Sequence, residues 1–247
     1  ILRTLAKVAR LYVHESKRHE TLARIADALF HLASAAKPGS DFQFQAVKFF
    51  THFAITDHQL DQLDGLFAGR LALPGLAIDQ DLRWDILAGL AVGGRVGEAE
   101  IDAEFAKDNT SNGQRLSALA RAAIATPEAK EKAFARLVES DELSNVVLRD
   151  TALGFARVNN TSLLDPFIDR YCDAVEGIWK GRTFKIANYL IEGLYPMRLT
   201  SPKLATATAA LLARPGVRAT PALARKVSEN LDEINRAIKA QAKDAGN

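Results

Sequence analysis

The residues best suited to chemistry in this sequence are His14, Glu15 and His19, which come close to the H-E-x-x-H pattern of zinc peptidases. In that pattern the histidines are four residues apart, so both reach one zinc ion from the same helix face. Here they are five residues apart, which turns them roughly 140° away from each other on a helix. His19-Glu20 restarts the pattern, but Ala23 stands where the second histidine is needed. We therefore predict a solvated, charge-rich helix junction here and no zinc ligands.

The other histidines and the single cysteine form no catalytic or metal-binding set. His31, His52 and His58 are not joined by carboxylates or a cysteine at a recognised ligand spacing, and each is expected at the core edge or on the surface. Cys172 has no partner for an internal disulfide, so we expect a buried or half-buried thiol. The sequence therefore predicts no catalytic residues, no metal ligands and no cofactor-binding residues in this chain.

A small basic cluster, Lys180, Arg182 and Lys185, is the remaining candidate for a binding site. Neighbouring cations of this kind would suit an acidic group on a ligand. The alternative interpretation is ordinary surface charge at a solvated helix end. Both interpretations predict side chains that are at least partly exposed.

Three further patterns have structural explanations beside their chemical ones. Asp79 and Asp81 could act as a carboxylate pair, but just ahead of Arg83 they are more simply an N-cap and a partner of the helix dipole. Trp84 could be a ligand platform, although its place in an apolar stripe favours core packing. Residues 93–97 (Gly-Gly-Arg-Val-Gly) follow a helix and lack the lysine and hydroxyl of a phosphate loop, which predicts a turn between helices.

A repeat with a period of 32 residues predicts the elements that carry these groups. Trp84, Leu116 and Leu148 each open an apolar stripe with the spacing i, i+3, i+4, i+7, i+8, which covers one face of a helix. The recurrence of that face at a fixed period is typical of stacked helical hairpins. The three stripes are Trp84, Leu87, Ala88, Ala91, Val92; Leu116, Leu119, Ala120, Ala123, Ile124; and Leu148, Thr151, Ala152, Phe155, Ala156.

We expect an all-α fold, an α-solenoid of about six or seven antiparallel helix pairs similar to HEAT or armadillo repeats, in a single domain over residues 1–247. No segment shows sustained strand alternation, and a single globular bundle fits the period less well. Asp41 and Thr126 are the expected N-caps of two of the helices. The expected helices cover 2–13, 22–30, 46–54, 57–68, 84–92, 98–106, 116–124, a segment from 127, 148–156, 163–175, 183–194, 202–213 and 220–242.

The composition argues against a nucleic-acid or membrane partner. The 32 basic residues are balanced by 30 acidic ones, so the concentrated positive charge that nucleic acid requires is absent. No apolar run approaches the roughly 20 residues that cross a bilayer. The chain begins at Ile1 within an expected helix and its only methionine is Met197, so we expect a piece of a longer protein. The expected location is cytoplasmic.

A set of residues between Leu76 and Phe155 carries a family resemblance. The set is Leu82-Arg83-Trp84, Gly94, Glu98-Ala99-Glu100-Ile101, Asp108-x-Thr110, Gly113, Pro127-x-Ala129-Lys130, Leu137, Leu143-Ser144-Asn145 and Gly154-Phe155. Together these residues resemble the C-terminal helical domain of bacterial aminopeptidase N, a gluzincin zinc metallopeptidase family, and the similar domain of the endoplasmic reticulum aminopeptidases. Phe134 stands where the family pattern has tryptophan, a conservative change for packing.

The resemblance implies a parent zinc aminopeptidase that removes N-terminal amino acids from peptides, with Zn bound in its catalytic domain. The family's zinc helix, downstream glutamate, Gly-Ala-Met-Glu-Asn motif and transition-state tyrosine have no match here, so no catalytic residue is carried over. The resemblance further implies a cap that closes over the parent catalytic domain in cis, encloses its chamber and contacts the tail of peptide substrates. Lys180, Arg182 and Lys185 are the candidate tail contacts, and the chain alone is expected to be inactive.

Two alternatives belong to other classes of protein. One is a free-standing helical-repeat scaffold that binds another protein in its groove. The other is a helical-repeat DNA glycosylase, against which the near-neutral net charge argues.

Overall fold

The computed structural model describes residues 1–139 and 143–246, and every regular element within those ranges is a helix. The first half contains α1 (Leu2–Lys7), the π-helix η1 (Val8–Tyr12), α2 (Glu15–Ala35), α3 (Asp41–Phe53), α4 (Asp57–Phe67), α5 (Gln80–Val92), α6 (Glu98–Phe105), α7 (Ser111–Ala123), α8 (Pro127–Glu139) and α9 (Asn145–Phe155). The second half contains η2 (Thr161–Leu164), α10 (Phe167–Gly181), α11 (Phe184–Leu194), η3 (Met197–Leu199), α12 (Pro202–Ala213), α13 (Pro215–Arg218) and α14 (Pro221–Ala245). None of the described helices has the length and hydrophobicity that a membrane span requires.

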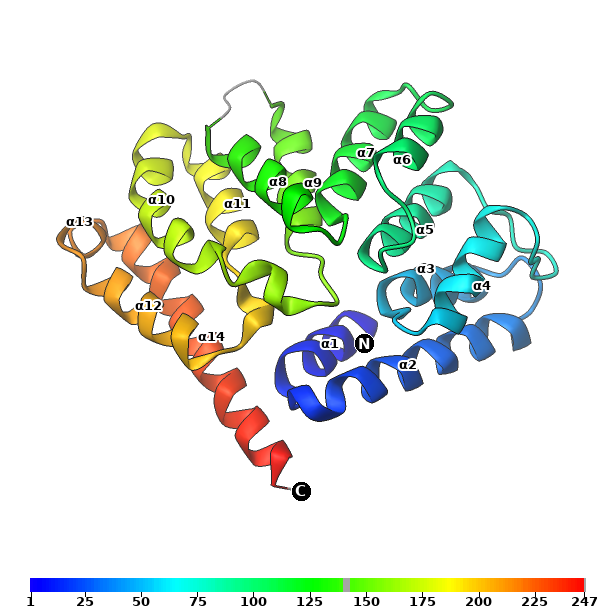
Figure 1. Ribbon diagram of the computed structural model, residues 1–247, viewed down its shortest axis with the longest axis horizontal. Helices are drawn as coiled ribbons and strands as arrows, with labels where there is room; N and C mark the ends of the chain where they lie inside the picture. The colour runs from blue at the N-terminus through cyan, green and yellow to red at the C-terminus, as the bar shows by residue number, and fades with distance from the viewer. Residues whose placement is uncertain (140–142, 247) are drawn as a thin grey trace.

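The helices form an arch of stacked hairpins (Figure 1). Helices α3, α5, α7, α9 and α11 pack on one another in chain order and make a continuous inner layer. Each of them is the second helix of a hairpin. Within the described ranges the six pairs are α2 with α3, α4 with α5, α6 with α7, α8 with α9, α10 with α11, and α12 with α14. The predicted all-α solenoid of antiparallel pairs is confirmed.

Side-chain caps fix where most of the helices begin. Asp79 accepts a hydrogen bond from the main-chain N–H of Leu82 at the start of α5, as predicted, and Thr126 accepts one from Ala129 at the start of α8. The prediction that Asp41 is the N-cap of α3 was wrong by one residue. Ser40 is its N-cap, because its extended main chain lets the hydroxyl reach the third N–H of the helix, and Asp41 is the first helical residue.

The three predicted stripes lie in the core. Trp84 is 1% exposed and Leu148 is 2% exposed, whereas Leu116 is half-buried. The buried residues form three clusters that follow one another along the arch instead of meeting at one centre. This arrangement is typical of a solenoid, in which each repeat packs against its neighbours.

Glycines let the inner helices approach one another closely. A Cβ atom at Gly154 in α9 would lie 2.1 Å from the carbonyl oxygen of Leu119 in α7. A Cβ atom at Gly89 in α5 would lie 2.6 Å from the carbonyl oxygen of Thr51 in α3. Real Cβ atoms do not approach carbonyl oxygens so closely, so the spacing of the inner layer requires glycine at both positions.

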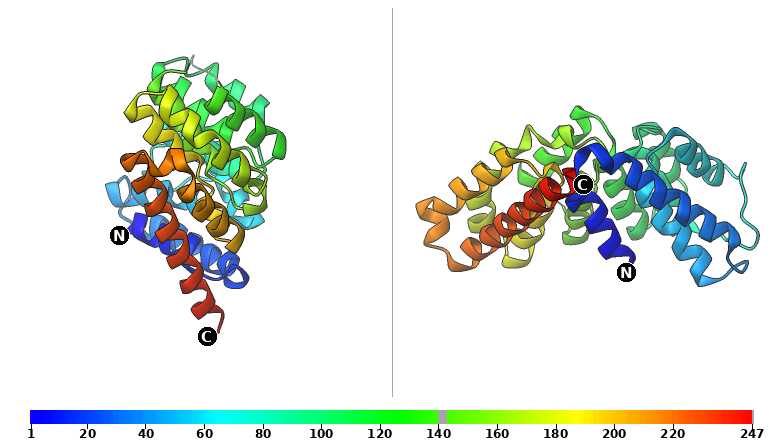
Figure 2. Two further views of the ribbon diagram at one scale, coloured as in Figure 1. Left: turned by 90° about the vertical axis from the view of Figure 1, so that its left-hand side faces the viewer. Right: turned by 90° about the horizontal axis from the view of Figure 1, so that it is seen from below.

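The first and last helices meet and close the arch (Figure 2). The Tyr12 hydroxyl donates to Glu233 of α14 at 2.6 Å, and the amide of the buried Gln241 donates to the Leu11 carbonyl at 2.7 Å. The expected helix over 2–13 is α-helical only to Lys7. It then continues as a π-helix, an element common at functional sites. In this position the N-terminal segment covers the inner side of the arch.

Candidate functional site

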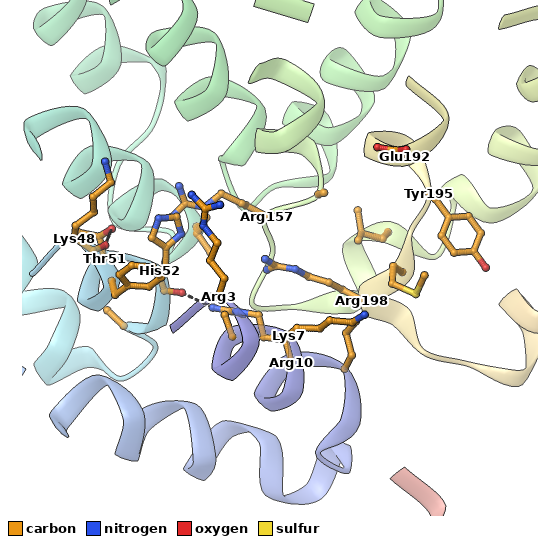
Figure 3. Close-up of a pocket in the computed structure, with 18 of the residues that line it drawn as sticks. Arg3, Lys7, Arg10, Lys48, Thr51, His52, Arg157, Glu192, Tyr195 and Arg198 are labelled. Carbon is orange, nitrogen blue, oxygen red and sulfur yellow. Dashed lines mark hydrogen bonds between the residues drawn. The ribbon is translucent and has the colours of Figure 1, made fainter. Parts of the chain in front are cut away.

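A cavity of about 590 Å³ lies on the inner side of the arch, beneath α1 and η1 (Figure 3). The C-terminal ends of α3 and α5, the segment after α9 and the end of α11 form the rest of its wall. A volume of this size is within the usual range of small-molecule sites.

The repeat explains why these segments meet. The inner helices all run in the same direction because each is the second member of a hairpin, so their C-terminal ends lie along one edge of the inner layer. His52 is in the last turn of α3, Val92 ends α5, Arg157 follows α9 and Arg198 follows α11. Arg10 approaches this edge from η1. Helix C-termini carry partial negative charge, which favours cations at these positions.

Among the described residues, neutral oxygens and not carboxylates accept hydrogen bonds from the arginines of the cavity. Arg10 Nη1 donates to the side-chain oxygen of Asn159 at 3.5 Å. The Arg10 guanidinium donates to the carbonyl of His52, and Arg198 Nη1 donates to the carbonyl of Val158 at 2.8 Å. The Arg157 side chain makes no hydrogen bond or ion pair with any residue that the structure describes. Its guanidinium therefore has unused donors that face the cavity.

The charges that line the cavity are unbalanced. Among the described residues, Glu192 is the only carboxylate in the wall, and it pairs with Lys226 and lies apart from the arginines in Figure 3. Lys7 and Lys48 each have a carboxylate at 3.0 Å, provided by Glu233 and Asp85. The basic side chains in the wall are Arg3, Lys7, Arg10, Lys48, Arg157 and Arg198.

This concentration of positive charge lowers the pKa values of several basic side chains that line the cavity. The Arg157 charge, together with burial and the charges of Arg10 and Arg198, holds the pKa of His52 well below its ordinary value. Burial, with Arg157 and Arg18 nearby, lowers the pKa of Arg10 to about 10. Burial and the charges of Arg10 and Arg157 lower the pKa of Arg198. The cavity therefore disfavours further positive charge and favours an anion.

The predicted basic cluster lies elsewhere. Lys180 and Arg182 are at the C-terminal end of α10, and Lys185 is in the first turn of α11. Lys180 is 3.8 Å from Glu176, Lys185 is exposed and Arg182 is half-buried. Because the opposite end of α11 borders the cavity, the length of that helix, roughly 16 Å, separates the cluster from the cavity.

The histidines of the near-zinc pattern also lie apart. His14 precedes α2 as its N-cap, where its ring is 2.8 Å from the Ser16 hydroxyl, whereas His19 is exposed within the helix. The prediction of a helix junction is confirmed. Residues 1–139 and 143–246 contain no group of three or more His, Cys, Asp or Glu side chains that could hold a metal ion. Cys172 is buried, and burial raises the pKa of its thiol.

Several residues that carry the family resemblance have structural roles. The indole N–H of Trp84 donates to Asp108 at 2.8 Å, and Thr110 donates to the same carboxylate. Arg83 forms a two-point ion pair with the buried Glu104, at 2.7 and 2.8 Å. These contacts join α5 to α6 and to the turn that follows α6, so they position the repeats and perform no chemistry.

The Glu104 ion pair predicts a specific loss of stability in acid. Arg83, followed by Gln80, lowers the pKa of Glu104 to about 2, so the folded protein gains stability above the unfolded value of 4.5 and loses it as the pH falls toward 2. Glu104→Gln is expected to lower the free energy of unfolding by about 2 kcal/mol at pH 6. In urea titrations its difference from wild type should shrink below pH 4.5. A constant difference down to pH 2.5 would contradict this account, and Glu20→Gln, at an exposed position, should match wild type throughout.

The sequence did not indicate the arginines of the cavity. Arg10, Arg157 and Arg198 are far apart in the chain, and no helical or motif spacing joins them. The sequence feature most closely related to the cavity is the 32-residue repeat, because it places the C-terminal ends of the inner helices together. It does not predict which side chains stand at those ends.

Comparison with known proteins agrees with the resemblance. The family described as the ERAP1-like C-terminal domain matches residues 1–236. Aminopeptidase N of Streptomyces lividans is 39% identical over 234 residues, which is 95% of the chain and 27% of that relative. The chain therefore spans about a quarter of the length of this relative. The predicted resemblance is confirmed.

Proposed function

Because the chain belongs to the ERAP1-like C-terminal domain family, we propose that it forms the C-terminal cap of a zinc-dependent aminopeptidase. That enzyme would remove N-terminal amino acids from peptides. The match to an aminopeptidase N along 95% of the chain supports this proposal over a free-standing scaffold. We also propose that residues 1–247 act as one domain and that the protein is cytoplasmic.

The proposed role of the chain is enclosure, and bond breaking would take place in another domain. The described residues offer no set of ligands that fits zinc, so the metal would belong to the catalytic domain. That domain would be the partner of this chain in cis. A cap that excludes water strengthens electrostatic interactions at the reacting bond and limits which substrates enter.

The observation that best supports a cap is the closed arch with its hollow inner side. Contacts between η1 and α14 join the two ends of the solenoid, so the inner wall is a continuous surface and not an open groove. Such a wall suits one side of a chamber that holds peptides. Lys180, Arg182 and Lys185 are proposed to contact the tail of a bound peptide at the edge of this wall.

The proposal is tested with the purified 247-residue chain and aminoacyl-arylamide substrates. No release of amino acids and no bound zinc are expected. The genomic sequence upstream of Ile1 is expected to encode H-E-x-x-H in the same reading frame. Turnover that survives rigorous purification, or a reading frame that begins at Ile1 with no peptidase sequence before it, would contradict the proposal.

A further inference from the structure

We propose that the cavity beneath η1 binds a small polyanion, a ligand with two or more carboxylate or phosphate groups, through Arg10, Arg157 and Arg198. This inference goes beyond the cap role. It rests on the residues that line the cavity, so it can be tested on this chain without the catalytic domain.

No carboxylate among the described residues forms a hydrogen bond or an ion pair with these three arginines. A guanidinium carries five N–H donors and no acceptor, and leaving such a charge half-buried without a counter-charge is unfavourable. Arg157 has no hydrogen-bond or ion-pair partner among the described residues, and Asp85, whose charge acts on it, already pairs with Lys48 at 3.0 Å. Arg10 donates to the His52 carbonyl and to the side-chain oxygen of Asn159. Arg198 donates to the Val158 carbonyl, so all of these acceptors are neutral. An anion in the cavity would provide the missing counter-charge.

The three arginines converge on one cavity from separate segments of the chain. Arg10 comes from η1, Arg157 from the segment after α9 and Arg198 from η3, yet all three line the same space. In Figure 3, Arg157 and Arg198 extend from the α9 and α11 side of the cavity toward the N-terminal helix that carries Arg3 and Arg10. Guanidinium groups bind carboxylate and phosphate oxygens with two parallel hydrogen bonds, so several of them suit a multiply charged ligand.

The cavity has the size and the mixed apolar and basic lining of a site for an organic ligand. A volume of about 590 Å³ exceeds the size of one simple inorganic anion. Phe49, Leu164 and Met197 add an apolar surface beside the arginines. Small-molecule sites commonly combine an apolar wall with a few polar groups that orient the ligand. The cavity therefore suits an organic polyanion better than an isolated chloride or phosphate ion.

The backbone around Arg10 is irregular, which is an observation independent of the charges. Arg10 lies within the π-helix Val8–Tyr12, between the buried residues Ala9 and Leu11. Both of these neighbours are buried, and the Arg10 side chain lines the cavity. π-helical turns are irregular segments that occur frequently at functional sites.

The test is calorimetric titration of the 247-residue chain with citrate and with pyrophosphate, beside acetate and chloride at the same ionic strength. Saturable binding of citrate or pyrophosphate, at least tenfold tighter than binding of acetate, is expected. The tighter of the two polyanions identifies carboxylate or phosphate as the preferred group. Equal weak effects of all four salts would indicate general screening and would overturn the proposal.

Two variants test the residues, with thermal unfolding as a second readout. Arg157→Met and Arg198→Met keep the apolar part of the side chain and remove its charge, and each is expected to weaken polyanion binding at least tenfold. The unfolding temperature without ligand should be unchanged or higher, because a buried unpaired charge is removed. Arg225→Met is the matched control, since Arg225 is exposed on α14 and pairs with Glu229. Unchanged binding in both cavity variants, or equal weakening in the control, would overturn the proposal.

Discussion

Gly154→Ala is expected to lower the free energy of unfolding by about 3 kcal/mol or more, although it adds a single methyl group. The new Cβ atom would lie 2.1 Å from the Leu119 carbonyl oxygen and 3.0 Å from the Cβ of Ala122. The first of these neighbours is main chain, so α7 and α9 must move apart to relieve the overlap. Equilibrium unfolding in urea, with the wild type measured in parallel, gives the difference.

Gly177→Ala is the matched control for this prediction. Gly177 also lies inside a helix, α10, but a Cβ atom there meets nothing within 4 Å. The change is expected to stabilise the protein by about 0.5 to 1 kcal/mol, since alanine favours the helix over glycine. If both variants had the same effect, close helix contact would not be the reason for glycine at position 154.

Lys130→Met is expected to cause the second large loss, about 3 kcal/mol at pH 9. Lys130 is completely buried, and its Nζ lies within hydrogen-bond distance of four main-chain carbonyl oxygens, those of Ala122 at 2.6 Å, Phe155 at 3.2 Å, and Gly154 and Arg157 at 3.3 Å. It thereby joins the C-terminal ends of α7 and α9, whose last carbonyls have no partner within their helices. Methionine fills similar space but donates no hydrogen bond.

The loss caused by this variant should depend on pH. Burial, with Arg198 and Arg157 nearby, lowers the pKa of Lys130 from 10.5 to about 7 in the folded protein. Between these values the unfolded chain binds more protons than the folded one, so the wild type gains stability as the pH rises. The loss should therefore be about 2 kcal/mol smaller at pH 6 than at pH 9. A loss of equal size at both pH values would contradict this assignment.

Lys132→Met provides the control on the same helix. Lys132 is 74% exposed and forms a surface ion pair with Glu98. Its replacement is expected to change the free energy of unfolding by less than about 0.5 kcal/mol at both pH values.

The fold could be predicted from the sequence because its repeat is local. The stripes that begin at Trp84 and Leu148 show the helical period, and the caps at Asp79 and Thr126 follow short-range rules. Gly154 and Lys130 were visible as parts of a family pattern, but their roles depend on the contact of α7 with α9. That contact has no local signature, so neither role could be predicted from the sequence.

The candidate site could not be predicted because it is assembled from distant segments. Nothing in the sequence near Arg10 indicates the π-helical turn, and nothing joins it to Arg157 or Arg198. The sequence indicated Lys180, Arg182 and Lys185 as the candidate binding residues, because these cations are close neighbours in the chain. The closure of the arch by η1 and α14 brings the other cations together in space.

The central claim is that this chain caps an aminopeptidase, and peptide-length discrimination tests it most directly. The complete enzyme and a form that lacks residues 1–247 should be compared on an aminoacyl-arylamide and on a series of peptides from two to twelve residues, with the isolated chain then added back. Turnover of the arylamide verifies that the shortened enzyme is folded. The account predicts at least a tenfold change in the ratio of long-peptide to short-peptide kcat/KM without the chain, and recovery when it is added. An unchanged ratio in an active shortened enzyme would contradict it.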